Sequence, residues 1–273
     1  MITSNIVNKI EALPPLPQTI IDIEEFRKKS DKETFELLEI VEKDALIIST
    51  LLKIANSAIF GFRSKVETPS RAINLLGMNF TMTIAIGGVV QNLLITNLEP
   101  YGISCNDFMK ASNLSSSLAN LWLSKVDYDL KNELSLPSLL QEAGKFILAD
   151  IMISEGKTKE FKLKIDSGVE LSIAEKEIIG FNTSEITAKI FRHWKLSEEL
   201  IKLIENVDDI SKCDEEIKQK AQILNVIKTA CNVIDPLSKK NIELAIKKSD
   251  EYGLNTRELE KAIEKIQDRL LDE

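Results

Sequence analysis

Histidine is almost absent from this sequence, since His193 is the single one among 273 residues. One imidazole is too few for the multi-histidine zinc and di-iron centres that a single chain can build. Ser-His-Asp and Cys-His catalytic groups would have to use this same residue, which we expect at a helix end beside Trp194. The phosphate-binding motifs G-x-x-x-x-G-K-[ST] and G-x-G-x-x-G are missing too. These absences argue against most metal-dependent, nucleophilic and nucleotide-binding enzymes.

Cysteines are also few, and acidic residues outnumber basic ones. The three cysteines, Cys105, Cys213 and Cys231, form no C-x-x-C pair, so we expect neither a disulfide framework nor a structural zinc site. This favours a reducing cytoplasm, and Lys9 and Glu11 make the N-terminal stretch unlike a secretion signal. Because 35 Lys and Arg face 43 Asp and Glu, the net charge is -8. An acidic surface repels phosphate backbones, so we expect no nucleic acid partner.

Charge is missing altogether from Ala72 to Leu98, and the stretch from Met78 to Ile95 is long enough to cross a bilayer. Its Asn, Gln and Thr side chains would need partners in hydrocarbon, and no Lys/Arg cluster flanks it. We therefore predict a buried core helix and no membrane span. Membrane attachment is the alternative, and sedimentation without detergent would test it.

Apolar residues recur at helical spacing along most of the chain, which predicts an all-α protein. The stretch from Asp44 to Ile59 is apolar on nearly every face and predicts a central helix that Asp44 caps and Gly61 ends. Pro137 is expected to open a helix over 138–153. In the C-terminal part an apolar stripe either closes the bundle or pairs with another chain, and we favour packing on the body. The stripe comprises Ile217, Ala221, Leu224, Cys231 and Ile234.

Four ordered motifs resemble the signature of the HDOD domain, a bacterial helical signalling module related to the HD-domain phosphohydrolases. They are Leu13-Pro14-Pro15-Leu16-Pro17, Val41-Glu42-Lys43-Asp44, the run Leu51 to Gly61 with its Ala-Asn-Ser-x-x-Phe-Gly element, and Ala72-Ile73-Asn74-Leu75-Leu76-Gly77. The resemblance implies a multi-helix HD-like bundle over residues 1–206. Its signature half is 1–100 and its degenerate half 101–206, followed by a C-terminal helical extension over 207–273.

The metal ligands of the catalytic relatives are lost in the degenerate half. Their His-Asp-x-Gly-Lys run corresponds here to Gln141-Glu142-Ala143-Gly144-Lys145, which keeps Gly144 and Lys145. Ala111 stands where an early His is found, and Thr183 where related sequences often carry another. The resemblance thus implies a chain with no bound metal or cofactor and no hydrolase activity. We expect Glu142 and Lys145 on a salt-linked surface turn; the alternative is a residual phosphodiesterase that uses Glu142 and Asp150.

The resemblance therefore implies a non-catalytic regulatory module that binds other signalling or regulatory proteins, with a homo-oligomer left open. An aromatic pair beside cations can anchor a partner. In the alternative interpretation Asn56 and Ser57 end a helix and Phe60 fills the core. The candidate contact residues are Asn56, Ser57, Phe60, Gly61, Phe62, Arg63 and Lys65.

Overall fold

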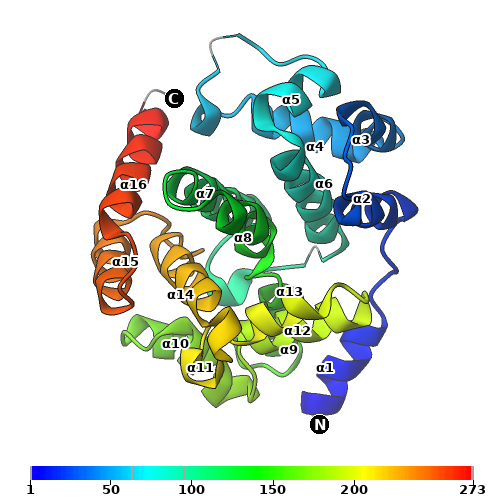
Figure 1. Cartoon of the computed structure of the whole chain (residues 1–273). Helices are drawn as coiled ribbons and strands as arrows, with labels where there is room; N and C mark the ends of the chain where they lie inside the picture. Colours follow the sequence, from blue (N-terminus) through cyan, green and yellow to red (C-terminus); the bar gives the residue numbers. More distant parts are fainter. Residues whose placement is uncertain (1, 63, 95, 272–273) are drawn as a thin grey trace.

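The computed structural model describes residues 2–62, 64–94 and 96–271, and these residues form helices and no β-strand. The predicted all-α fold is confirmed (Figure 1). The N-terminal elements are α1 (Ile2–Glu11), α2 (Gln18–Lys28), α3 (Thr34–Val41), α4 (Ala45–Ala55), η1 (Ala58–Phe60), α5 (Pro69–Leu76), α6 (Met78–Leu93) and η2 (Glu99–Tyr101).

The rest of the described chain consists of a central helical hairpin, a group of shorter helices, and a 3-10 turn followed by three C-terminal α-helices. The first two groups are α7 (Cys105–Leu123), α8 (Tyr128–Leu140), α9 (Gly144–Ser154), α10 (Thr158–Asp166), α11 (Leu171–Ile179), α12 (Thr183–His193) and α13 (Glu198–Glu205). The last group is η3 (Ile210–Lys212), α14 (Glu215–Ala230), α15 (Lys239–Glu251) and α16 (Thr256–Leu271).

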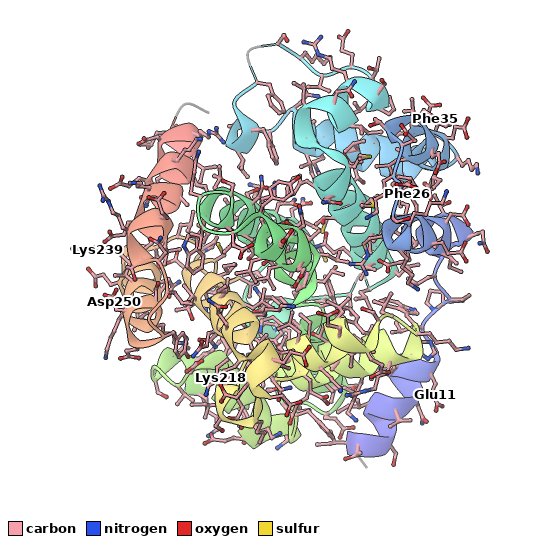
Figure 2. All side chains as sticks on the ribbon, viewed as in Figure 1. Glu11, Phe26, Phe35, Lys218, Lys239 and Asp250 are labelled. Atoms are coloured by element: carbon pink, nitrogen blue, oxygen red, sulfur yellow. The ribbon has the colours of Figure 1, made fainter. Side chains whose placement is uncertain are left out.

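Helices α7 and α8 form the centre of the molecule (Figure 1). Helix α8 also contacts α6, α13 and α14, while α7 contacts α14 and α16. The buried Trp122 of α7 donates its Nε1 hydrogen to the carbonyl of Asn255 at 3.0 Å, which fixes the turn before α16. The C-terminal helices therefore pack on the body, and their outer side carries polar residues such as Lys239 and Asp250 (Figure 2).

Helix α4 begins as the sequence predicts but ends earlier. The Asp44 carboxylate accepts hydrogen bonds from the backbone N–H groups of Leu46 and Ile47, at 2.9 and 3.3 Å, so the predicted cap is confirmed. The predicted end at Gly61 is wrong, because Asn56 stops the helix and turns the chain into a loop. Gly61 instead takes the left-handed conformation within that loop, with φ of +58°.

Helix α6 is the uncharged segment, and the predicted buried core helix is confirmed over Met78–Leu93; Ile95 lies outside the described residues. It packs on α2, α4 and α8. A methyl group on Gly87 would lie 2.0 Å from Leu139 of α8, and one on Gly88 would lie 2.8 Å from Thr50 of α4. The glycine pair is therefore a close helix-packing site, as the sequence predicts. No described helix could by itself cross a membrane, and α5 and α6, which together have the required length, are bent by 118°.

The break between α8 and α9 does not lie where proline predicts it. Pro137 is buried inside α8, so the expectation that it opens a helix over 138–153 is wrong. Pro137 removes one internal hydrogen bond, but buried neighbours such as Leu136 and Leu139 pack the helix on both sides of it. The chain breaks instead at 141–143, where the backbone approaches α12.

Candidate functional site

The turn between α8 and α9 carries the degenerate motif, Gln141 to Lys145, and packs closely against the first residues of α12. The N–H of Gly144 donates to Oγ1 of Thr187 at 2.8 Å. A methyl group on Gly144 would lie 2.4 Å from the carbonyl oxygen of Thr183. Only a residue without a side chain permits this approach. The close contact places Glu142 and Lys145 next to the N-terminus of α12.

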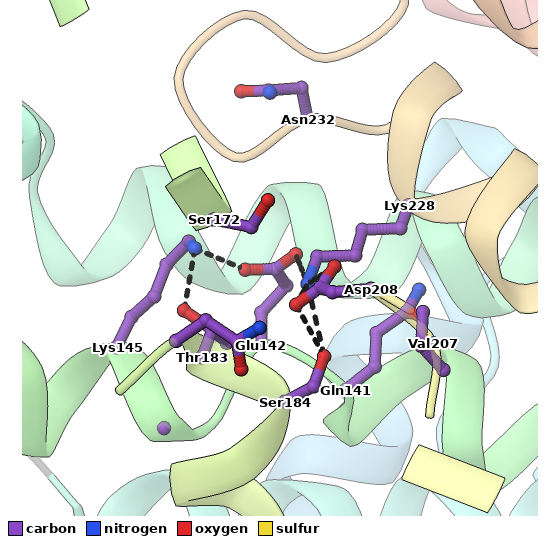
Figure 3. A network of polar contacts seen from close by, with 12 residues as sticks. Gln141, Glu142, Lys145, Ser172, Thr183, Ser184, Val207, Asp208, Lys228 and Asn232 are labelled. Carbon is purple, nitrogen blue, oxygen red and sulfur yellow. Dashed lines mark hydrogen bonds and ion pairs between the residues drawn. The ribbon is translucent and has the colours of Figure 1, made fainter. Parts of the chain in front are cut away.

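Lys145 is buried, with 2% of its side chain exposed, so the predicted surface turn is wrong. Its ammonium lies 2.7 Å from Glu142 Oε2 and 2.9 Å from Thr183 Oγ1 (Figure 3). It also lies 2.9 Å from Glu175 Oε1. Burial lowers the pKa of Lys145, but the charges of Glu142 and Glu175 outweigh it and raise the pKa above its ordinary value. Lys145 is thus a buried cation between two carboxylates.

Glu175 of α11 is the most enclosed of these carboxylates, with no exposed surface. Its Oε2 accepts the backbone N–H of Thr183 at 2.7 Å, and its Oε1 accepts the hydroxyl of Tyr101 at 2.9 Å. Burial, followed by the charges of Glu175 and Glu142, raises the pKa of Tyr101 well above its ordinary value. Tyr101 therefore stays a neutral hydrogen-bond donor, and the Lys145 ammonium lies 5.0 Å from the centre of its ring.

A second lysine reaches the same cluster from α14. Lys228 Nζ lies 2.7 and 2.9 Å from the two carboxylate oxygens of Asp208 and 3.5 Å from Glu142 Oε1. Ser184 donates its hydroxyl to Asp208 Oδ2 at 2.5 Å (Figure 3). Burial raises the pKa of Asp208, but the Lys228 charge and the hydrogen bonds from Lys228 and Ser184 bring it below its ordinary value. We call Glu142, Lys145, Glu175, Asp208 and Lys228 the ion network.

The ion network does not fit a metal ion. Each oxygen of Glu142 faces a different ammonium, and both oxygens of Asp208 face Lys228. Within residues 2–62, 64–94 and 96–271, no three His, Cys, Asp or Glu side chains converge as metal ligands would. Two ammonium groups supply the positive charge that carboxylates otherwise take from a cation.

The other degenerate positions take no part in the ion network. Ala111 is fully buried in α7. The Gln141 side chain is 1% exposed, and neither its amide nitrogen nor its amide oxygen has a hydrogen-bond partner among the described residues. Asp150, the second carboxylate of the phosphodiesterase alternative, pairs with Lys9 of α1 at 2.5 Å and does not belong to the network. The structure therefore leaves Glu142 without the companion that this alternative needs.

The predicted contact residues lie in the loop between α4 and α5, which Asn56 holds closed. Its Nδ2 donates to the carbonyls of Leu52 and Val66, and its Oδ1 accepts the N–H of Val66, each at 2.8 Å. Ser57 donates to the carbonyl of Ile54 at 2.8 Å. Both residues thus end α4, while their role in binding a partner stays a prediction.

The tip of this loop combines aromatic rings with an exposed lysine. Phe60 is half-buried and packs on Phe62 and Phe80, with ring centres 6.0 and 5.4 Å apart. Lys65 is exposed, and Arg63 lies outside the described residues. From α16, Arg269 donates a hydrogen bond to the carbonyl of Ile59. The last helix is therefore in direct contact with the loop.

Sequence reasoning did not connect Glu175, Asp208, Lys228 and Tyr101 with this turn, because they come from separate helices and loops. One signal was present in α14. Lys228 follows Leu224 by four residues and precedes Cys231 by three, so it lies on the apolar stripe that we singled out. A lysine on a buried stripe needs a buried carboxylate. The predicted apolar stripe was also one residue too long, since its last member, Ile234, is 41% exposed.

Comparison with known proteins gives the family of this chain. An uncharacterized protein from Treponema pallidum (strain Nichols) is 20% identical over 221 residues, which cover 80% of this chain and 42% of that protein. This chain thus spans less than half the length of that relative. A proposed phosphohydrolase from Shewanella amazonensis has a TM-score of 0.72 at 19% identity and covers 97% of this chain and 98% of its own.

A proposed signal transduction protein from Marinobacter aquaeolei has a TM-score of 0.68 at 18% identity, over 94% of this chain and 60% of that chain. At such identities the structural likeness shows a shared fold. The HDOD domain model matches residues 13–210, well over half of the sequence and all four signature motifs. The chain therefore belongs to the HDOD domain family.

Proposed function

We propose that this chain is a non-catalytic regulatory module of signal transduction that acts by binding other proteins. The observation that carries the proposal is the pairing of Glu142, whose two carboxylate oxygens face Lys145 and Lys228. A hydrolase of phosphate esters needs a metal or a free base to activate water. A carboxylate between two ammonium groups supplies neither. A shared fold with a proposed signal transduction protein adds support.

The loop between α4 and α5 is the surface that we assign to the partner. Asn56 joins the end of α4 to Val66 through two hydrogen bonds, so a partner meets a partly preformed surface and loses less entropy in binding it. Phe62 offers a half-buried ring, and Lys65 an exposed charge with one distant partner, Glu67 at 3.9 Å. An aromatic anchor beside a cation suits a protein surface with apolar and acidic groups.

Affinity capture from the native organism tests this assignment. We expect the tag-free chain to retain a specific set of proteins that Lys65→Glu and Phe62→Ala lose. The matched control is Lys240→Glu, which makes the same charge change on the exposed surface of α15. Equal recovery with all variants would contradict the assignment of the loop.

An enzymatic assay tests the non-catalytic part. We expect the purified chain to leave phosphodiesters unhydrolysed, with and without added Mg²⁺ or Mn²⁺. Turnover that disappears in Glu142→Ala would overturn the proposal in favour of a phosphodiesterase. We also place the module in the cytoplasm, because Cys105, Cys213 and Cys231 are all free thiols in the structure.

A further inference from the structure

The ammonium of Lys228 is surrounded by the kind of oxygen atoms that bind hard divalent cations. Two oxygens of Asp208 lie within 2.9 Å of it, and one oxygen of Glu142 and the hydroxyl of Ser184 lie at 3.5 Å. Carboxylate and hydroxyl oxygens with no nitrogen or sulfur donor are typical of Mg²⁺, Ca²⁺ and Mn²⁺ sites. By its chemistry the position is therefore a cation site. The cation that occupies it is the ammonium of Lys228, which is part of the chain itself.

Lys228 comes from outside the matched domain, while the other residues around this position come from within it. Its helix, α14, begins at Glu215, after the end of the HDOD match at residue 210, whereas Glu142, Ser184 and Asp208 lie within the match. Next to Glu142, the buried Gln141 keeps an amide oxygen without a hydrogen-bond partner among the described residues. The turn that carries Glu142 thus also holds a buried amide group with no hydrogen bond (Gln141 is labelled in Figure 3).

Charge explains why the position cannot stay empty. Lys145 lies between Glu142 and Glu175, so its single positive charge is shared by two carboxylates. Lys228 is the cation in contact with Asp208. Without Lys228, Asp208 and Glu142 would share a largely buried space with too little positive charge. Two carboxylates that are buried together without a counter-charge attract any small cation that can reach them.

We propose that Lys228 is a built-in substitute for a divalent cation, so that docking of α14 and binding of Mg²⁺ or Mn²⁺ at Asp208 and Glu142 exclude each other. The C-terminal extension thereby keeps the centre of the HDOD domain free of metal. This inference concerns metal binding and is independent of which proteins the module binds. It predicts that removal of the Lys228 charge creates a metal site.

Mn²⁺ titration of the full chain, followed by the electron paramagnetic resonance of free Mn²⁺, tests the proposal directly. We expect wild type, Lys228→Arg and the control Lys218→Met, which changes an exposed lysine of the same helix, to bind no Mn²⁺ at this site. We expect Lys228→Met and Lys228→Gln to bind about one Mn²⁺ per chain and to gain about 3 °C in Tm when millimolar Mn²⁺ is added. Adding Asp208→Asn to either variant should abolish both effects.

Two results would overturn the inference. One is wild-type protein that binds an equivalent of Mn²⁺ which Asp208→Asn removes, because Lys228 would then not exclude the metal. The other is a folded Lys228→Gln or Lys228→Met protein that binds no more Mn²⁺ than wild type. Neither result affects the partner-binding proposal, which the loop variants test. If Lys228→Met folds only when Mn²⁺ is present, the inference is supported, since the metal then replaces the lost charge.

Discussion

Lys228 lies 2.7 Å from one carboxylate oxygen of Asp208 and 2.9 Å from the other, so a single ammonium donates hydrogen bonds to both oxygens. The two side chains are 14% and 4% exposed. A charge pair this well enclosed is costly to break, because removing one partner leaves the other without compensation. The pair joins α14 to the segment after α13. The C-terminal extension thereby supplies a positive charge to a buried carboxylate of the domain.

Asp208→Asn should lower the free energy of unfolding by about 2–4 kcal/mol at pH 7, because Lys228 loses its nearest counter-charge. Urea unfolding with a constant m-value measures the change. The matched control is Asp209→Asn, one residue further along, whose pair with Lys212 is exposed on both sides. We expect this control to cost less than about 1 kcal/mol. Equal losses for the two variants would contradict the assigned importance of the buried pair.

The stability that Asp208 contributes should depend on pH. Its pKa is lower in the folded chain than in the unfolded chain, so its contribution is complete above the unfolded value near pH 4. The contribution is lost as the pH falls through the folded pKa. The difference in unfolding free energy between wild type and Asp208→Asn should therefore shrink below about pH 4. Urea titrations at several pH values test this, and a difference that stays constant would argue against it.

Lys145→Met should be strongly destabilising, at about 3–5 kcal/mol, since it leaves the buried Glu175 without a cation and Glu142 with Lys228 alone, at 3.5 Å. Lys162→Met removes an exposed pair with Glu99 and is the control, with an expected cost below about 1 kcal/mol. Combining Lys145→Met with Glu175→Gln should recover part of the loss, which a double-mutant cycle measures. Strictly additive costs would mean that the two side chains do not interact.

Asn56→Ala should loosen the loop between α4 and α5, because three hydrogen bonds to Leu52 and Val66 disappear together. We expect a cost of about 2 kcal/mol and faster amide exchange over 57–62 and 64–66. Asn206→Ala is the matched control, since Asn206 also ends a helix but its side chain makes one described hydrogen bond, to the carbonyl of Lys202. Unchanged exchange in the loop would show that Asn56 does not hold it.

The sequence predicts the helical elements well because their signals are local. Asp44 caps α4 from two residues away, and the Gly87–Gly88 pair lies in an apolar segment that must be surrounded. Pro137 misleads because packing on both sides of a helix outweighs one missing hydrogen bond. Local preferences thus locate most helices but not the breaks that tertiary contacts impose.

The candidate site was only half predictable. The motif around Glu142 and Lys145 shows the loss of the metal ligands, but nothing near it in the sequence shows what replaces them. A Glu three residues before a Lys on a helix usually indicates a surface pair. Its burial depends on Glu175 and Thr183, which are 30 and 38 residues from Lys145. Contacts over such separations follow from topology, which periodicity does not encode.

The ion network also bears on the order of folding. Its members become neighbours only after α11, the start of α12 and α14 have all docked on the turn before α9. Until then each charge is better solvated by water than by a partial set of partners. Contacts between distant parts of the chain form slowly, because the intervening loops must close first. We therefore expect the central helices to collapse with this corner still hydrated, and the network to complete the native state in a last, cooperative step.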